Sequence, residues 1–189
     1  MTGGLGAGKS TALEALERLG AAVLSTDKVV HDLYATAQVR DAVVERFGAD
    51  VAPGGVVDRR ALADSVFASD EDRKWIEALL WPQVRERMAA WRAEAERRSP
   101  RPPASVVEVP LLFESGLERA FDATIAVVAD ETVRAGRAGA RGHAALAERT
   151  ARQLSQEEKA AKAQYVVVND GTPAELEAAL SGLLDMLRR

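Results

Sequence analysis

The sequence contains no cysteine and few aromatic residues. Without a thiol, the 189-residue chain has no disulfide, no thiolate zinc or iron–sulfur site and no cysteine nucleophile. This absence fits a reducing compartment, and we expect a cytoplasmic protein. Phenylalanine, tryptophan and tyrosine make up only 5% of the residues, which identifies no function. A chain of this length buries about 70% of its unfolded surface, so it folds without disulfides or metals.

Long apolar runs and an excess of positive charge are also missing. No apolar stretch approaches the roughly 18 residues of a membrane span, and the first residues do not resemble a signal peptide. The net charge is −4, from 25 basic and 29 acidic residues, which does not favour nucleic acid. We therefore expect no membrane and no nucleic acid as partners, and infer no obligate protein partner. An anionic substrate would be held by local clusters of arginine and lysine.

The most informative motif is a glycine-rich loop at residues 3–10, with the sequence Gly-Gly-Leu-Gly-Ala-Gly-Lys-Ser. It matches G-x-x-x-x-G-K-S/T, whose backbone N–H groups surround nucleotide phosphates at the start of a helix. Gly3, Gly6 and Gly8 permit torsions and close approaches that a Cβ would block. Lys9 is expected to reach the β- and γ-phosphates, and Ser10 to ligate Mg²⁺. The motif, called the P-loop below, predicts binding of ATP or GTP. Its predicted nucleotide-binding residues are Gly3, Gly4, Gly6, Ala7, Gly8, Lys9, Ser10 and Thr11.

A P-loop normally follows a buried β-strand, yet only Met1 and Thr2 precede this one. We therefore expect the first strand of the sheet to be missing from the chain, with the natural start further upstream. In P-loop kinases that strand lies in the middle of a parallel sheet, so its loss leaves both neighbours unpaired. Each buried unpaired group costs about 1–3 kcal/mol, against a total stability of about 5–15 kcal/mol.

Apolar periodicity and turn signals predict an α/β fold. A helix is expected from about Lys9 to Leu19, followed by a mostly helical region that contains one helix starting near Ser69 and another after Pro82. Capping boxes at residues 155–158 and 172–175 begin two further helices. Strands are expected near residues 21–25, 105–109, 122–129 and 165–168. Because helices separate these apolar runs, the strands should be parallel.

Seven motifs, in order, make the chain resemble the dephospho-CoA kinase family over nearly its whole length. The family has a Thr-Gly-Gly P-loop, Asp-Ala-Asp after the second strand, Phe-Gly, Asp-Arg-x-x-Leu, Val-Pro-Leu-Leu-Phe-Glu, spaced lid arginines, and Asn-Asp-Gly. The corresponding segments here are residues 2–10, 25–27, 47–48, 58–62, 109–114, 137–153 and 169–171. Single motifs are common, but this order and spacing are specific.

This resemblance implies transfer of the ATP γ-phosphoryl group to the 3′-hydroxyl of the ribose of dephospho-CoA, the last step of coenzyme A biosynthesis, with Mg²⁺ as cofactor. The implied fold is a three-layer P-loop kinase fold with a parallel five-stranded sheet, here without its first strand. Residues 1–189 would form a single domain, with a helical acceptor-binding insertion at about 28–103 and a helical lid at about 131–160.

Asp27 and Arg137 are the catalytic candidates beside Lys9, and Arg141 is expected to bind the nucleotide. Asp27 follows a strand at the sheet edge where ligands bind, so it is expected to orient or deprotonate the acceptor hydroxyl. An N-cap for the next helix is the alternative. Arg137 and Arg141 are one helical turn apart and suit phosphate oxygens, whereas most such basic runs are solvated helix faces.

Other site residues follow from the resemblance. Asn169 would meet the adenine edge, although an Asn before Asp-Gly is also an ordinary turn residue. Leu111, Leu112 and Glu114 would line the acceptor pocket, with a turn cap as the alternative for Glu114. Glu108 would join Ser10 in holding the metal.

Four positions depart from the family pattern. Ser25 and Glu108 stand where the family has Asp, Trp81 where it has His, and Gln164 where it has Asp. The extra methylene of Glu108 can shift a metal contact by about 1 Å, which costs on the order of 10²-fold in rate without compensation. Two other functions therefore stay open: a kinase of another small molecule or nucleotide, and a non-catalytic ATP-binding regulator.

Overall fold

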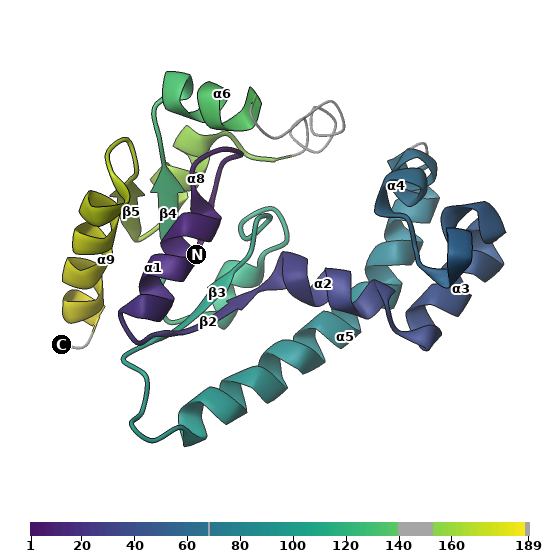
Figure 1. Cartoon of the computed structure of the whole chain (residues 1–189), viewed down its shortest axis with the longest axis horizontal. Coiled ribbons are helices and arrows are strands. Elements are labelled where there is room, and N and C mark those ends of the chain that lie inside the picture. The colour runs from purple at the N-terminus through teal and green to yellow at the C-terminus, as the bar shows by residue number, and fades with distance from the viewer. Residues whose placement is uncertain (68, 140–152, 188–189) are drawn as a thin grey trace. The chain divides into compact units, whose positions relative to one another are not determined.

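The computed structural model of the chain describes residues 1–67, 69–139 and 153–187 (Figure 1). These residues form two compact units, Met1–Ser25 with Glu94–Arg189, and Thr26–Ala93. The predicted α/β fold with a parallel sheet is confirmed. Among the helices of the described residues, none has the length and apolar composition needed to cross a bilayer.

Parallel strands form the centre of the first unit. They are Thr2–Gly3 (β1), Ala22–Ser25 (β2), Ser105–Glu108 (β3), Ile125–Val128 (β4) and Tyr165–Val168 (β5). β1, β4 and β5 form one ladder, in which Ile125 lies opposite Tyr165. β2 and β3 form a second ladder, in which Ser25 lies opposite Glu108. Valine and isoleucine predominate in β3, β4 and β5, where their branched side chains favour extended backbone.

Met1 joins the two ladders. Its amino group donates to the carbonyl oxygen of Val107 at 2.7 Å, and its own carbonyl accepts from the N–H of Val109 at 2.9 Å. The strand order is therefore β2-β3-β1-β4-β5. The first strand, which we expected to be missing, is present as the two residues of β1, and the main chain of Met1 extends its pairing to β3. A longer strand that begins upstream of Met1 stays a prediction.

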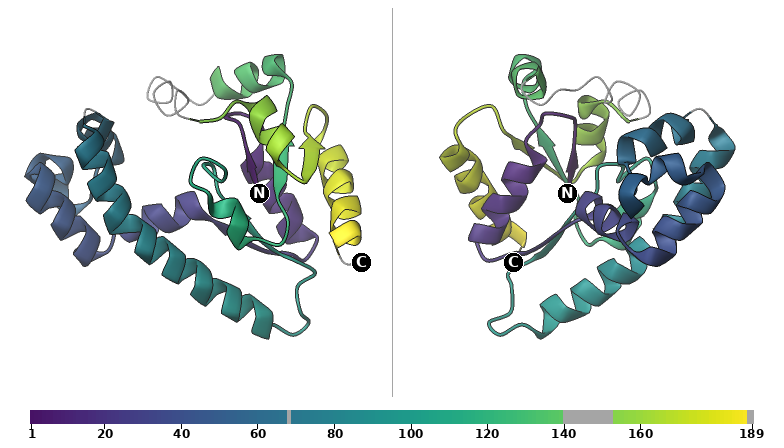
Figure 2. Two further views of the ribbon diagram at one scale, coloured as in Figure 1. Left: turned by 180° about the vertical axis from the view of Figure 1, so that it is seen from behind. Right: turned by 45° about the vertical axis from the view of Figure 1, so that its right-hand side comes forward.

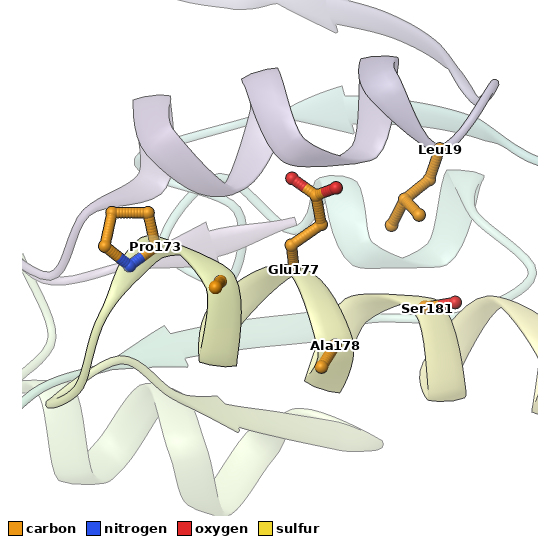
Figure 3. Close-up of a pocket in the computed structure, with 6 residues that line it drawn as sticks. Leu19, Pro173, Glu177, Ala178 and Ser181 are labelled. Atoms are coloured by element: carbon orange, nitrogen blue, oxygen red, sulfur yellow. The ribbon is translucent and has the colours of Figure 1, made fainter.

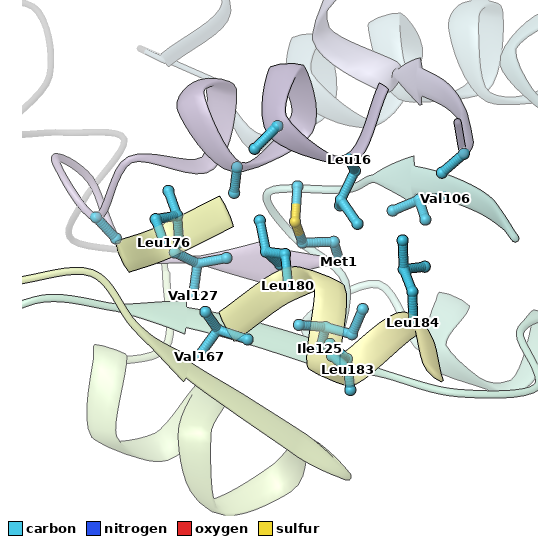
Figure 4. Packing of buried hydrophobic residues seen from close by; sticks show 14 residues of the cluster. Met1, Leu16, Val106, Ile125, Val127, Val167, Leu176, Leu180, Leu183 and Leu184 are labelled. Carbon is cyan, nitrogen blue, oxygen red and sulfur yellow. The ribbon is translucent and has the colours of Figure 1, made fainter. Parts of the chain in front are cut away.

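Helices cover both faces of the sheet. They are Lys9–Arg18 (α1), Gln156–Lys162 (α8) and Pro173–Leu187 (α9), while Glu131–Gly139 (α6) lies beyond the carboxyl end of β4 (Figure 1). The right-hand view of Figure 2 shows α8 on the opposite side of the sheet from α1 and α9. Leu176, Leu180 and Leu184 form a buried stripe along α9 that packs in one core with Leu16 and Val127 (Figure 4). This stripe has the spacing of an amphipathic helix.

The second unit is helical. It contains Thr26–Tyr34 (α2), Ala37–Phe47 (α3), Arg59–Phe67 (α4) and most of Asp70–Arg97 (α5). The Phe47 and Trp75 rings pack edge to face with centroids 5.7 Å apart. The prediction of separate helices around Pro82 is wrong, because α5 continues through it. Pro82 removes only its own N–H bond, and the Gln83 side chain adds a bond of 2.9 Å to the Leu79 carbonyl.

Candidate active site

The P-loop connects β1 to α1 and has the backbone that its glycines predict. Gly6 and Gly8 have φ values of +74° and +86°, in the left-handed region that favours glycine. A Cβ on Gly3 would collide with the carbonyl oxygen of Val127, and one on Gly8 with the Asn169 side-chain amide. Gly8 is also the N-cap of α1. The loop therefore lies at a helix N-terminus, where backbone N–H groups and the helix dipole attract anions.

Lys9 places a positive charge on the P-loop itself. Its ammonium group donates to the carbonyl oxygens of Gly3 and Gly4, each at 3.1 Å. The lysine thus folds back over the loop from the first residue of α1. This position agrees with its predicted role toward phosphates, since an ammonium group held at the loop attracts their negative charge.

Asn169 ties the segment after β5 to the P-loop. It is buried, and its side-chain amide donates to the Ala7 carbonyl oxygen at 2.9 Å. Its backbone N–H donates to the carbonyl oxygen of Val128 at the end of β4, at 2.8 Å. Asn169 is therefore beside the nucleotide loop, as its predicted role requires, while a contact with adenine stays a prediction.

Two arginines of α6 contact the same region. Arg137 donates to the Asn169 carbonyl oxygen at 3.0 Å, and Arg134 donates to the Leu5 carbonyl oxygen at 3.0 Å. Arg134 also pairs with the exposed Glu131 at 3.3 Å. The sequence analysis missed Arg134, although its i, i+3 spacing from Arg137 was an available signal. The predicted partner Arg141 lies outside the described residues.

The predicted metal residues line one cavity of about 160 Å³. Ser10 lies on its rim in α1, and the buried Glu108 ends β3. Ser25 lines the same cavity and donates to a carboxylate oxygen of Glu108 at 2.7 Å. The remaining lining residues are Leu13, Glu14, Glu17 and Val23.

These oxygen atoms fit Mg²⁺ in kind. Mg²⁺ prefers oxygen ligands and is usually held by one or two carboxylates together with substrate phosphates and water. Within the described part of the chain, no group of three or more His, Cys, Asp or Glu side chains could form a metal cage by itself. Ser10 and Glu108 would therefore share the ion with the nucleotide. The departure at Ser25 now has a structural role, because its hydroxyl orients the Glu108 carboxylate.

The predicted acceptor residues differ in exposure. Leu111 is 36% exposed, whereas Leu112 is fully buried and offers no side-chain surface to a ligand in this state. Glu114 forms an ion pair with Lys159 at 3.1 Å and accepts a hydrogen bond from the Leu154 N–H at 2.8 Å. Both contacts of Glu114 are therefore within the protein, and its contact with an acceptor stays a prediction.

Asp27 belongs to the second unit. It is an exposed residue in the first turn of α2, which begins one residue earlier at Thr26. The N-cap alternative is therefore wrong, since Asp27 is already inside the helix. A carboxylate in the first helical turn is favoured by the helix dipole. The helix therefore accommodates Asp27 at this position, and its role toward the acceptor hydroxyl stays a prediction.

Gln164 joins the starts of β4 and β5. Its side-chain oxygen accepts from the Thr124 N–H at 2.9 Å, and its own N–H donates to the Thr124 hydroxyl at 3.0 Å. This departure from the family pattern is thus part of the sheet.

A larger cavity of about 450 Å³ lies between Leu19 and α9 (Figure 3). None of the predicted site residues lines that cavity.

Comparisons with known proteins agree with one another. The dephospho-CoA kinase family model matches residues 1–175. A dephospho-CoA kinase of Geobacter sulfurreducens is 37% identical over 182 residues, which cover 94% of this chain and 91% of that protein. A Thermus thermophilus crystal structure is 36% identical, has a TM-score of 0.73, and the match covers 98% of this chain and 95% of that one. A dephospho-CoA kinase structure from Campylobacter jejuni shares the fold, with a TM-score of 0.69, 22% identity, and coverage of 99% and 94%.

Proposed function

The chain belongs to the dephospho-CoA kinase family, and we propose that it transfers the ATP γ-phosphoryl group to the 3′-hydroxyl of the ribose of dephospho-CoA. The products are coenzyme A and ADP. One observation carries the proposal: the P-loop, Asn169 and the α6 arginines contact one another at the carboxyl ends of β1, β4 and β5. In open α/β sheets, ligands bind at this edge.

Each site residue has its own proposed role in phosphoryl transfer. Lys9 and Arg137 neutralise the charge that spreads over the phosphoryl oxygens in the transition state, which is the main requirement of phosphoryl transfer. Arg141 is proposed to do the same from the lid. Asp27 holds the acceptor hydroxyl and accepts its proton. When bound between Ser10, Glu108 and the nucleotide, Mg²⁺ would neutralise phosphate charge.

The residues proposed to bind the acceptor are assigned from the family resemblance. The helical insertion at about 28–103, with Leu111, Leu112 and Glu114 of the loop after β3, is proposed to bind dephospho-CoA. Residues of about 131–160 are proposed to act as a lid within a single domain of residues 1–189. The net charge of −4 supports a small-molecule partner over nucleic acid, and we propose the cytoplasm as the place of reaction.

Release of ADP tests this proposal directly. The purified chain is incubated with ATP and Mg²⁺, with dephospho-CoA or with coenzyme A, whose 3′-hydroxyl is already phosphorylated. We expect ADP release that depends on dephospho-CoA, is absent with coenzyme A and is abolished by Lys9→Ala. ATP turnover with other acceptors but not with dephospho-CoA would support a different small-molecule kinase. ATP binding without any turnover would support a regulator.

A further inference from the structure

A buried lysine lies on the opposite side of the sheet from α1. Lys159 is in the middle of α8, and none of its surface is exposed. Its ammonium group donates to the Pro110 carbonyl oxygen at 2.5 Å and pairs with Glu114 at 3.1 Å. Taking an ammonium group out of water costs several kcal/mol, which its partners must offset. An apolar residue at this position would avoid that cost, so packing alone does not explain a buried lysine here.

Both partners of Lys159 belong to one loop. Pro110 and Glu114 lie on either side of Leu111 in the segment after β3. A turn later in this segment has a hydrogen bond of 3.1 Å from the Leu117 N–H to the Leu112 carbonyl oxygen. Through these two partners, Lys159 holds the loop at both ends of its first turn. Leu111, the exposed residue proposed to contact the acceptor, lies between the two held points.

The segment of residues 154–156, which leads into α8, is bonded both to this loop and to the residue after β4. Glu114 accepts from the N–H of Leu154, which precedes α8. Gln156 exchanges two side-chain bonds with the backbone of Ala129, at 2.8 and 2.9 Å, immediately before α6. The second oxygen of Glu114 is buried and has no hydrogen-bond partner among the described residues. The lysine ion pair thus lies where the loop of residues 110–117 meets residues 154–156.

We propose that Lys159 is a positioning residue that holds the loop of residues 110–117 in register with the segment of residues 154–156. It touches no substrate. It acts through Pro110 and Glu114, and so sets where Leu111 and residues 154–156 stand relative to each other. The part that concerns the acceptor rests on the proposed function.

Two readouts test this inference in the full chain. Lys159→Met keeps the length of the side chain and removes the charge, and Lys162→Met is its matched control, because Lys162 is exposed on the same helix. We expect Lys159→Met to raise the KM for dephospho-CoA about tenfold or more, since a shift near 1 Å costs up to about 10²-fold. The KM for ATP should stay within about twofold. Amide hydrogen exchange at Leu154 and in residues 110–117 should become at least about tenfold faster, with other sheet amides unchanged.

Lys159→Met leaves the Glu114 carboxylate buried without its partner, so the variant can fail to fold. In that case Lys159→Met combined with Glu114→Gln is compared with Glu114→Gln alone. A higher KM for dephospho-CoA and faster exchange in the double variant support the proposal, because the two variants differ only in the lysine's bonds to Pro110 and to the amide oxygen that replaces the carboxylate. Equal values in the two variants overturn it.

The exchange readout also separates this inference from the proposed function. If the unaltered chain gives no ADP with dephospho-CoA, the proposed function fails. Exchange at Leu154 and residues 110–117 then still decides whether Lys159 holds this loop against residues 154–156. Unchanged exchange in Lys159→Met would refute the positioning role even in a fully active kinase.

Discussion

The side-chain amide of Asn169 donates a hydrogen bond of 2.9 Å to the carbonyl oxygen of Ala7, across 162 residues of chain. The bond ties the segment after β5 to the P-loop. Arg137 then donates to the Asn169 backbone carbonyl at 3.0 Å. A residue of the P-loop, a buried asparagine and an arginine of α6 therefore form one connected group, which holds the phosphate-binding loop in shape before a nucleotide arrives.

Asn169→Ala should destabilise the protein. The substitution leaves the Ala7 carbonyl oxygen without its side-chain donor in a buried position, which costs about 1–3 kcal/mol. Urea unfolding followed by circular dichroism measures the change. Val168→Ala, at an exposed neighbour on β5, is the control and should change the unfolding free energy less. Equal losses in both variants would contradict the importance of the bond.

Arg137 and Arg134 should differ in their kinetic effects. Arg137→Ala removes a charge proposed to act in the transition state, so kcat should fall by about 10²–10³-fold. Arg134 instead anchors α6 to the Leu5 carbonyl of the P-loop. Arg134→Ala is expected to raise the KM for ATP about tenfold, in line with a lost charge-assisted hydrogen bond. Steady-state ADP release with varied ATP separates the two, and identical profiles would refute the division.

Asp27→Asn tests the proposed general base. The amide keeps the shape of the side chain but cannot accept a proton, so kcat should fall by about 10²–10⁴-fold with ATP binding little changed. Glu45→Gln, at an exposed acidic residue of α3 in the same unit, serves as a control for the lost charge. A kcat within about threefold of the unaltered enzyme would show that Asp27 has no catalytic role.

Ser25 and Glu108 should control the requirement for Mg²⁺. Ser25→Ala removes the hydroxyl that donates to Glu108 at 2.7 Å, and loss of such a supporting bond costs about 10–100-fold in metal affinity. Titration of the reaction rate with Mg²⁺ measures the effect, and Glu108→Gln should shift the midpoint at least as far. If neither substitution moves the midpoint, this cavity does not hold the ion.

The amino group of Met1 should make stability depend on pH. Burial lowers its pKa to about 5, an effect that the nearby Glu108 carboxylate partly opposes, whereas the unfolded value is 8.0. Between these values the unfolded chain binds the proton and the folded chain does not. The unfolding free energy should therefore rise with pH from about 5 to 8, by at most about 1.4 kcal/mol per pH unit.

Urea unfolding at several pH values measures this slope in a polypeptide that begins at Met1. The N-terminally acetylated form is the control, because it carries no titrating amino group. We expect its unfolding free energy to change less over the same range. The same slope in both forms would assign the pH dependence to other groups.

Local signals in the sequence predicted much of the fold. The capping box at Ser155 and Glu158 is present, with both of its hydrogen bonds. β5 has the predicted bounds of residues 165–168, and α9 ends at Leu187 as expected. Gly6 and Gly8 of the P-loop have the left-handed torsions that their motif requires. These features depend on residues a few positions apart, so a single sequence contains the information.

Two local interpretations were wrong for identifiable reasons. Pro82 does not end a helix, since the turns before and after it keep their own bonds within α5. The first strand is present as Thr2–Gly3, which pairs with β4, and Met1 bonds to β3. In both places the hydrogen bonds of the folded chain decided the outcome, not a local signal in the sequence.

The sequence by itself determined the nucleotide-binding loop, the alternation of helices and strands, and the family whose residues it shares. Only the tertiary structure decided that Ser25 supports Glu108, that Arg134 anchors α6 to the P-loop, and that Lys159 holds Glu114. These pairs are brought together by parallel strand order and by helix packing on the sheet. These contacts join residues dozens of positions apart, and their separation in sequence follows no rule. The pairs therefore leave no periodic or short-range signal in the chain.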